Sequence, residues 1–226
     1  MHVNDWTFSL RNPDSIHILD NSGNIFFGCD QEWFKSHWQR LSGCGPSVAS
    51  NLLLYLHRAK CISLPVDVNN QSDCIKFMEV VWSHVTPTRK GIYKLEQFYK
   101  GVHSFAQAHG YNLEGFSLDI PKKSTERPEM SAIVDFIADG LLHDCPIAFL
   151  NLSNGMVSNL DQWHWVTIVS LKTDLNNSHV FAKIYDAAQS IIIDLKLWRE
   201  TTSLGGGFVF FKKTVDDLHN IETKGI

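Results

Sequence analysis

Residues 39–56 read Gln39-Arg40-Leu41-Ser42-Gly43-Cys44-Gly45-Pro46-Ser47-Val48-Ala49-Ser50-Asn51-Leu52-Leu53-Leu54-Tyr55-Leu56. Apolar side chains recur from Val48 onward with the spacing of a helix that is apolar on most of its surface, which indicates a buried helix. Pro46 suits the first turn of such a helix, because the missing N–H of proline would have no intrahelical partner there. The stretch therefore predicts a core helix with Cys44 at its N-terminal end.

This position gives Cys44 a chemical role as well as a structural one. The unpaired N–H groups and the positive end of the helix dipole favour an anion, so they stabilise the thiolate, which is the form that attacks carbonyl carbon. The alternative is a structural cysteine, since free cysteine is among the most buried residues. Gly43 and Gly45 favour the reactive role, because small neighbours leave the sulfur open to a substrate.

Composition and charge limit the possible functions. A chain of 226 residues can form a single domain with a sizeable core, and a net charge of -4 without a basic run argues against a dedicated nucleic-acid binder. The sequence has neither a secretory signal nor the ~20 consecutive apolar residues of a membrane span. Its five cysteines form no Cys-x-x-Cys pair, which favours free thiols over a disulfide framework or a zinc site. We therefore expect a cytoplasmic protein without a cofactor, metal ion or membrane partner.

The order of the predicted elements indicates an α+β fold in one domain, residues 1–226. Residues 1–29 read as a β-hairpin around a turn at 20–24, residues 30–145 as a helical subdomain, and residues 146–212 as a β subdomain. Apolar spacing predicts further helices over 75–82, 95–108 and 129–142. Short β-rich runs follow at 147–152, 163–171, 180–185, 191–195 and 208–212, with another at 116–120. Residues 122–128 read as an exposed loop, and residues 205–207, three glycines, as a flexible loop before the last strand.

His164 opens the most apolar of the predicted strands. A strand that is apolar on both faces is typically central, and a polar side chain at its rim needs a partner. If the strand at 180–185 folds back on it with Val166 opposite Ile184, then His164 lies opposite Asp186 with Cβ atoms roughly 5 Å apart. A carboxylate at that distance can orient an imidazole. The alternatives are a structural histidine and an aspartate that only forms a turn.

Gln39 could complete the site. Its side-chain amide could join the backbone N–H of Cys44 in holding the oxyanion of a tetrahedral intermediate, an interaction worth ~3 kcal/mol when such a donor is removed. The alternative is a surface glutamine without a catalytic role.

Three motifs carry a resemblance to a known family: Cys-Gly-Pro-Ser at a helix start, Trp-His-Trp-Val-Thr-Ile-Val at a strand start, and Tyr-Asp-Ala-Ala-Gln at the end of the next strand. Over residues 30–212 the chain resembles papain-like cysteine peptidases, and most of all the branch of bacteriocin-processing double-glycine peptidases, known as peptidase C39. The resemblance implies a helical half with the nucleophile at a helix N-terminus, packed on a C-terminal antiparallel sheet. It further implies Cys44 as nucleophile, His164 as general base and acid, Asp186 as the orienting residue and Gln39 as oxyanion donor. The Gln39-to-Cys44 spacing is one residue shorter than is usual for this branch, and no transporter portion accompanies the motifs, so export-coupled processing is not implied.

The sequence thus predicts a thiol-dependent hydrolase that cleaves a peptide or amide bond through an acyl-enzyme on Cys44. One alternative is an acyltransferase with the same Cys44, His164 and Asp186 site, and another is a non-catalytic papain-like binding module. Motifs for a zinc peptidase or a phosphate-binding loop are absent from the sequence. The substrate and the oligomeric state stay open at this stage.

Overall fold

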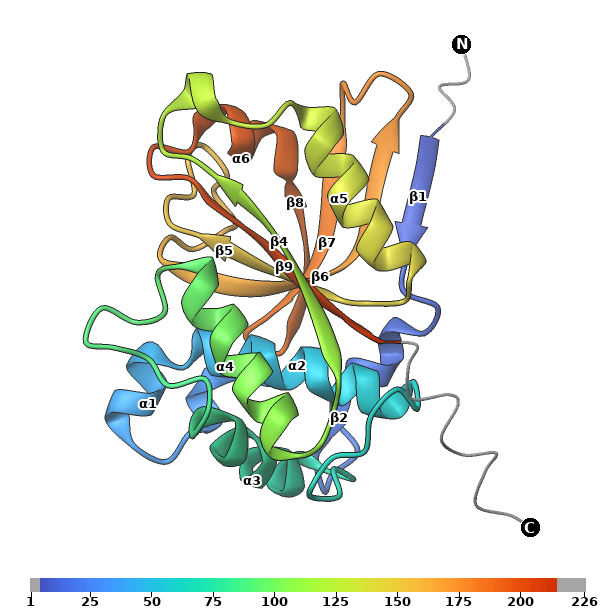
Figure 1. Cartoon of the computed structure of the whole chain (residues 1–226), viewed down its shortest axis with the longest axis vertical. Coiled ribbons are helices and arrows are strands. Elements are labelled where there is room, and N and C mark those ends of the chain that lie inside the picture. The colour runs from blue at the N-terminus through green and yellow to red at the C-terminus, as the bar shows by residue number, and fades with distance from the viewer. Residues whose placement is uncertain (1–4, 215–226) are drawn as a thin grey trace.

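A computed structural model describes residues 5–214, which form a helical half and a sheet half with α2 between them (Figure 1). The helices are α1 (His37–Ser42), α2 (Cys44–Arg58), α3 (Gln71–Trp82), α4 (Leu95–Ala108), α5 (Met130–Leu142) and α6 (Leu195–Thr201), with 3-10 turns at Pro13–Ile16, Gln31–Trp33 and Ser124–Glu126. The strands are β1 (Asp5–Ser9), β2 (Ile18–Leu19), β3 (Ile25–Phe26), β4 (Leu113–Ile120), β5 (Ile147–Asn151), β6 (His164–Asp174), β7 (Val180–Asp186), β8 (Gln189–Asp194) and β9 (Gly206–Lys213). The predicted α+β class is confirmed.

The sheet is antiparallel and is organised around β6. Its strand order is β4-β9-β5-β6-β7-β8, and β1 pairs with the second part of β6, beyond the end of β5. β5, β7 and β1 all hydrogen-bond to β6, and helices α2 and α5 pack against it. Most side chains of β6 are therefore buried on both faces. This explains its apolar sequence and makes it the rigid element on which His164 stands.

The predicted core helix is α2. Leu52, Leu53 and Leu54 are at most 1% exposed, and in Figure 1 the helix runs through the middle of the molecule, below the sheet and above α3. Its first intrahelical bond joins the N–H of Ser47 to the carbonyl of Gly43 at 2.9 Å. The N–H groups of Cys44 and Gly45 therefore precede the helical ladder.

A buried side chain, Asn51, joins α2 to both neighbouring parts of the fold. Its Nδ2 donates to the hydroxyl of Thr167 in β6 at 3.0 Å, and its Oδ1 accepts the N–H of Cys29 at 2.7 Å. Gly28 allows the close approach, since a Cβ there would lie 2.8 Å from the Asn51 amide. One side chain thus fixes the Cys44 helix, the His164 strand and the loop before residue 33 relative to one another.

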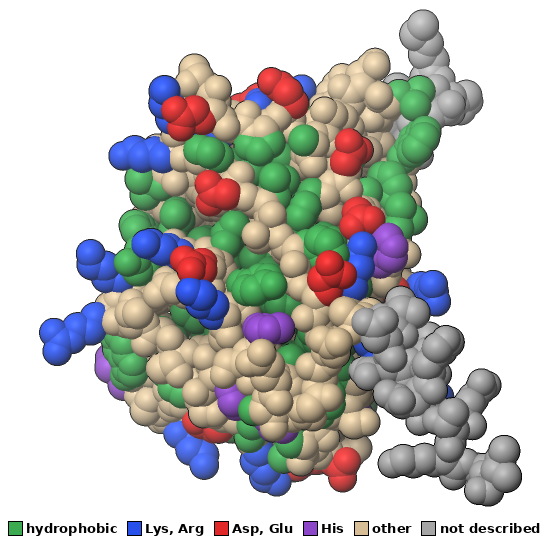
Figure 2. Space-filling model, in the orientation of Figure 1, with side chains coloured by type: hydrophobic (Ala, Val, Ile, Leu, Met, Phe, Trp, Pro, Cys, Tyr) green, Lys and Arg blue, Asp and Glu red, His purple; other side chains and the backbone are tan. Residues whose placement is uncertain are grey.

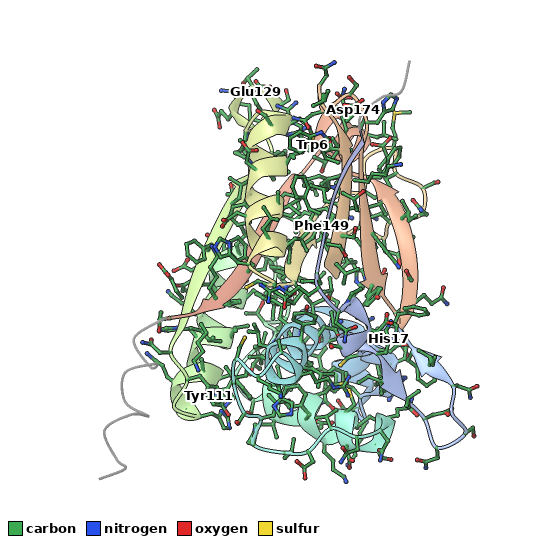
Figure 3. All side chains as sticks on the ribbon, turned by 90° about the vertical axis from the view of Figure 1, so that its right-hand side faces the viewer. Trp6, His17, Tyr111, Glu129, Phe149 and Asp174 are labelled. Atoms are coloured by element: carbon green, nitrogen blue, oxygen red, sulfur yellow. The ribbon has the colours of Figure 1, made fainter. Side chains whose placement is uncertain are left out.

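The N-terminal region is a hairpin only in part. β2 and β3 pair around Asp20, whose Oδ1 accepts the N–H groups of Ser22 and Asn24 at 2.8 Å, as the turn signals predict. β1 instead joins the main sheet. His17 lies where the hairpin meets the sheet half (Figure 3), with its Nε2 at 3.2 Å from the hydroxyl of Tyr185 in β7.

Two further expectations are corrected. The glycines predicted to form a flexible loop mostly belong to β9, where a Cβ on Gly206 would lie 2.0 Å from the carbonyl oxygen of Leu150 in β5. The glycine run therefore allows two strands to approach closely. The predicted register of β6 and β7 is wrong by two residues, since Ile184 lies opposite Ile168, and a bulge between Ile168 and Ser170 shifts the rest of the pair.

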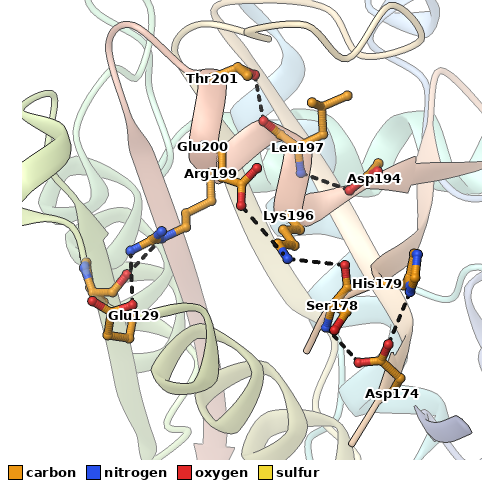
Figure 4. A network of polar contacts seen from close by, with 11 residues as sticks. Glu129, Asp174, Ser178, His179, Asp194, Lys196, Leu197, Arg199, Glu200 and Thr201 are labelled. Carbon is orange, nitrogen blue, oxygen red and sulfur yellow. Dashed lines mark hydrogen bonds and ion pairs between the residues drawn. The ribbon is translucent and has the colours of Figure 1, made fainter. Parts of the chain in front are cut away.

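Helix α6 was not predicted, and polar contacts hold it at the end of the sheet half (Figure 4). Asp194 caps it by accepting the N–H of Leu197 at 2.8 Å, and Arg199 reaches the carboxylate of Glu129 at 3.6 Å. Trp198 anchors the helix in the sheet core through its Nε1, which donates to Asn151 Oδ1 at 2.8 Å. In Figure 1 this helix lies at the opposite end of the molecule from α3.

Replacement of Asn51 tests how much the fold depends on this contact. We expect Asn51→Leu to lower the free energy of unfolding by about 2–4 kcal/mol, because it leaves the N–H of Cys29 and the hydroxyl of Thr167 buried without their partner. Urea denaturation followed by circular dichroism measures this loss. The control Asn176→Leu, at an exposed turn position, should change stability by less than about 0.5 kcal/mol. Equal losses in both variants would contradict the assigned role of Asn51.

Candidate active site

Cys44 is half-buried at the N-terminus of α2 and borders two hollows. Gly43 is needed beside it, because a Cβ there would lie 2.5 Å from the carbonyl oxygen of Gln39 and 2.8 Å from the ring of Phe34. A Cβ on Gly45 would lie 2.8 Å from the Ile92 side chain. The flanking glycines thus let the helix start pack closely against its surroundings, which places the sulfur at the surface of the two hollows.

His164 and Asp186 form a close pair across β6 and β7. His164 Nε2 lies 2.6 Å from Asp186 Oδ1, and their side chains are 16% and 12% exposed. Continuing the register of Thr167 with Tyr185 sets Asp186 two residues from the position opposite His164, so the two side chains meet diagonally on one face. The two-residue error in the predicted register keeps the side chains on that face, and for this reason the predicted pairing of His164 with Asp186 is found.

The His164 ring also interacts with Cys44. Burial disfavours the charged ring, but hydrogen bonds to Asp186 and to the side chain of Cys44, together with the negative charge of these groups, raise the pKa of His164 from 6.5 to about 10. Asp186 occupies Nε2, so Nδ1 is the ring nitrogen left for the sulfur. The structure thus brings together Cys44, His164 and Asp186, with the imidazole between the thiol and the carboxylate.

A two-residue turn positions Asp186. Ala187 and Ala188 connect β7 to β8 with φ angles of 45° and 58°, and Asp186 pairs with Gln189 across the turn. Positive φ at both central residues is the geometry of a tight hairpin that glycine or asparagine adopts more readily than alanine. The carbonyl of Ala188 accepts the N–H of Phe27 at 2.9 Å, which ties the turn to the N-terminal hairpin.

The structure contradicts the predicted role of Gln39. Its Nε2 donates to Glu79 at 2.6 Å and its Oε1 accepts the N–H of Ser36 at 3.2 Å, and Gln39 lines neither of the two hollows beside Cys44. Ser36 Oγ in turn accepts the N–H of Gln39, which completes a capping box at the start of α1. The spacing Ser-x-x-Gln is the sequence signature of that motif and could have identified the structural role of Gln39.

Gln31 is the glutamine that reaches the hollow with His164, and sequence reasoning missed it. It begins the 3-10 turn Gln31–Trp33, which Asp30 caps by accepting the N–H of Glu32 at 2.9 Å. Gln31 lines this hollow together with Cys44 and His164, and its Oε1 is buried without a hydrogen-bond partner. A buried amide oxygen without a partner, in the same hollow as Cys44 and His164, is a candidate for contact with a ligand.

We name this hollow the histidine-side pocket; it has a volume of about 170 Å³. Its polar and charged lining includes Asp30, Gln31, Glu32, Cys44, Ser47, Asn51, Asp161, His164, Tyr185 and Asp186. Carboxylates therefore dominate its charge.

The other hollow, which we name the apolar pocket, has a volume of about 290 Å³. Three of its lining side chains, Trp38, Leu41 and Trp163, are 45%, 66% and 54% exposed. The remaining lining residues include Ser42, Cys44, Arg89, Lys90, Gly91, Ile92, Leu150 and Leu152. Figure 2 shows lysine and arginine side chains protruding at the left edge of the molecule, where Figure 1 draws the loop between α3 and α4. The apolar pocket thus combines an apolar surface with a basic rim.

A larger hollow shares part of its lining with the apolar pocket. Leu150 and Leu152 also line this hollow, which has a volume of about 620 Å³ and lies between α4 and the end of β4. Ile92, which lines the apolar pocket, is held by the Trp165 indole, whose N–H donates to the carbonyl of Ile92 at 2.7 Å.

Residues 5–214 contain no group of three or more histidine, cysteine, aspartate or glutamate side chains placed to hold a metal ion. They also contain no helix of the length and apolar character that a membrane span requires.

Comparison with known proteins shows similarity in structure and not in sequence. No protein-family model and no curated protein matches the sequence. Solved structures do match, among them that of UfSP from C.elegans, with a TM-score of 0.52 and 8% sequence identity over 95% of this chain. The chain spans about a third of the length of that protein, since the match covers 35% of it. This likeness shows the papain-like fold that the sequence motifs imply.

The raised pKa of His164 predicts how the free energy of unfolding depends on pH. The charged ring stabilises the folded state fully below about pH 6.5, and this contribution is lost as the pH rises through about 10. We expect Asp186→Asn to lower the free energy of unfolding by about 3 kcal/mol near pH 6.5, with the difference from the unmodified protein narrowing toward pH 10. Urea denaturation across this range provides the measurement.

The pair of Lys100 and Glu96, whose side chains are 72% and 68% exposed, supplies the control. Glu96→Gln should change stability little at any pH in this range, because solvent screens exposed pairs. A difference for Asp186→Asn that stays constant across the range would contradict a charged His164 ring.

Proposed function

We propose that this protein is a thiol-dependent hydrolase that cleaves a peptide or amide bond through an acyl-enzyme on Cys44. The observation that supports it most directly is the placement of the His164 ring between Asp186 and the side chain of Cys44, the residue that borders both hollows. Nucleophile, base and orienting carboxylate in that order are the arrangement that thiol catalysis requires.

The arrangement accounts for both halves of the reaction. The Cys44 sulfur attacks the carbonyl carbon and forms a C–S bond; the C–N bond then breaks, and the departing nitrogen takes the proton from Nδ1 of His164. Water next attacks the thioester carbon while His164 accepts its proton, and the sulfur leaves. Asp186 holds Nε2 throughout and stabilises the charged ring in each step in which it forms.

The negative oxygen that forms on the carbonyl carbon needs donors. The N–H of Cys44 precedes the helical ladder of α2, and Gln31 lines the histidine-side pocket beside it. We assign the second donor to the amide of Gln31, in place of Gln39, whose amide is held by Glu79 and Ser36. Such a donor acts most strongly in a site that excludes water.

The comparison supports the class of reaction through the fold. UfSP is a cysteine protease, and the present chain shares its fold at 8% identity. Acyl transfer to an amine uses the same first step and differs only in the group that attacks the thioester. A non-catalytic binding module would share the fold without needing a paired His164 and Asp186.

Thiol labelling tests the nucleophile and its base. Iodoacetamide should modify Cys44 faster than Cys61, the other half-buried cysteine, because the His164 ring beside Cys44 can take the proton of the attacking thiol. His164→Ala should reduce labelling of Cys44 at pH 7 to the rate of an ordinary thiol, whereas His143→Ala, on the surface, should leave it unchanged. Peptide mapping by mass spectrometry measures each site, and equal labelling in the two variants would favour the binding module.

The two glutamines provide a matched test of the oxyanion site. Gln31→Ala should lower kcat about 10²–10³-fold, as for loss of a comparable donor, whereas Gln39→Ala should leave kcat within about threefold and lower stability by about 1 kcal/mol through loss of the capping box. Hydrolysis of N-acetyl-leucine p-nitrophenyl ester, with urea denaturation, measures both quantities. The reverse order of the two kcat values would return the role to Gln39.

A further inference from the structure

The two hollows beside Cys44 differ in which catalytic residue they contain. Both border Cys44, but His164 and Asp186 line only the histidine-side pocket. In the mechanism above, His164 gives its proton to the departing nitrogen, so that nitrogen must lie on the same side of the sulfur as the ring. Given the proposed function, the amine part of the substrate occupies the histidine-side pocket and the acyl part occupies the apolar pocket.

Apart from His164, the charged side chains that line the histidine-side pocket are all acidic. Asp30, Glu32 and Asp161 line it in addition to Asp186, which His164 already pairs. Among the described residues that line it, none is lysine or arginine. Arg40 approaches Glu32 only at 4.0 Å, and both side chains are substantially exposed. Three carboxylates therefore face whatever enters the pocket, although Asp30 also accepts the N–H of Glu32.

A second and independent observation points to a ligand in this pocket. Ser47 lies one helical turn after Cys44 and lines the pocket, it is 5% exposed, and its Oγ has no hydrogen-bond partner. A buried hydroxyl without a partner is unfavourable, and a bound hydrogen-bonding group would satisfy it. The buried Oε1 of Gln31 is likewise without a partner and accepts only.

We infer that the histidine-side pocket binds a cationic, hydrogen-donating group on the amine side of the scissile bond, such as an ammonium or guanidinium. The volume of about 170 Å³ suits the end of one such side chain. Carboxylates and the Oε1 of Gln31 offer acceptors, and an ammonium supplies several donors. The proposed substrate thus carries an apolar acyl part and a basic amine part.

The charged groups around Asp30 also support a bound cation in this pocket. Burial raises the pKa of Asp30 and a hydrogen bond from the N–H of Glu32 lowers it; the negative charges of Glu32 and Asp186 raise it, and the charge of His164 lowers it. Like charges gathered at one place favour a bound cation, because it relieves their repulsion.

Partitioning of the acyl-enzyme tests the inference. The intact protein is acylated with N-acetyl-leucine p-nitrophenyl ester, and lysine amide, norleucine amide or glutamate amide competes with water. In each case the α-amine attacks the thioester, a C–N bond replaces the C–S bond, and His164 takes the amine proton. We expect lysine amide to trap the acyl group about tenfold more efficiently than norleucine amide, with glutamate amide least efficient.

Matched variants test which carboxylates cause the preference for lysine amide. Glu32→Gln and Asp161→Asn together should reduce the lysine preference to less than about threefold, whereas Glu200→Gln, at an exposed carboxylate of α6 (Figure 4), should preserve it. High salt should weaken the preference for lysine amide in the unmodified protein, since Glu32 and Asp161 are exposed and salt screens exposed charges. Circular dichroism checks that each variant is folded.

The outcomes separate the two proposals. If no acyl-enzyme forms on Cys44, both the proposed function and this inference are overturned. If the acyl-enzyme forms but lysine amide is no better than norleucine amide, the inference alone fails and the hydrolase stands. If Glu200→Gln also removes the preference for lysine amide, the inference is likewise overturned, because general surface charge would then be the cause.

Discussion

The hydrogen bonds of Asn51 fix the arrangement on which the site depends. Cys44 is on α2 and His164 on β6, more than a hundred residues apart in the chain, and neither element alone determines where the other lies. The two bonds of the Asn51 amide, to Thr167 and to the N–H of Cys29, set α2 against β6 and against the loop that carries Gln31. Because all these groups are buried, an error of alignment would leave polar atoms without partners, which is costly in a low-dielectric core.

The same constraint allows a charged pair to persist in a largely buried place. Placing His164 and Asp186 out of water costs desolvation energy, and their 2.6 Å contact repays it only because both are held rigidly. The central strand supplies the rigidity on one side, and the turn of Ala187 and Ala188 supplies it on the other. Backbone conformations that alanine adopts reluctantly are found here beside the pair of His164 and Asp186, and such conformations are common at functional sites.

Local patterns in the sequence revealed the elements, and long-range geometry was harder to predict. The α2 helix, the β6 strand and the meeting of His164 with Asp186 followed from apolar spacing and from the two-residue period of a strand. The bulge beside Ile168 altered the register, and no local signal marked it. Gln39 was assigned to the oxyanion site through its nearness in sequence to Cys44, although Ser36 already marked it as part of a capping box. Gln31 was missed because only the folded loop brings it to the same hollow as Cys44.

Cys44 lies between two unlike hollows, so the two sides of the site differ in chemistry. One side of the sulfur presents indole rings and aliphatic chains beneath a basic rim, and the other presents carboxylates. Under the proposed function, a substrate that bound in the reverse orientation would bring its apolar part to the acidic side and lose both matches. The distribution of charge around the sulfur would then distinguish the two ends of the substrate before any bond is broken.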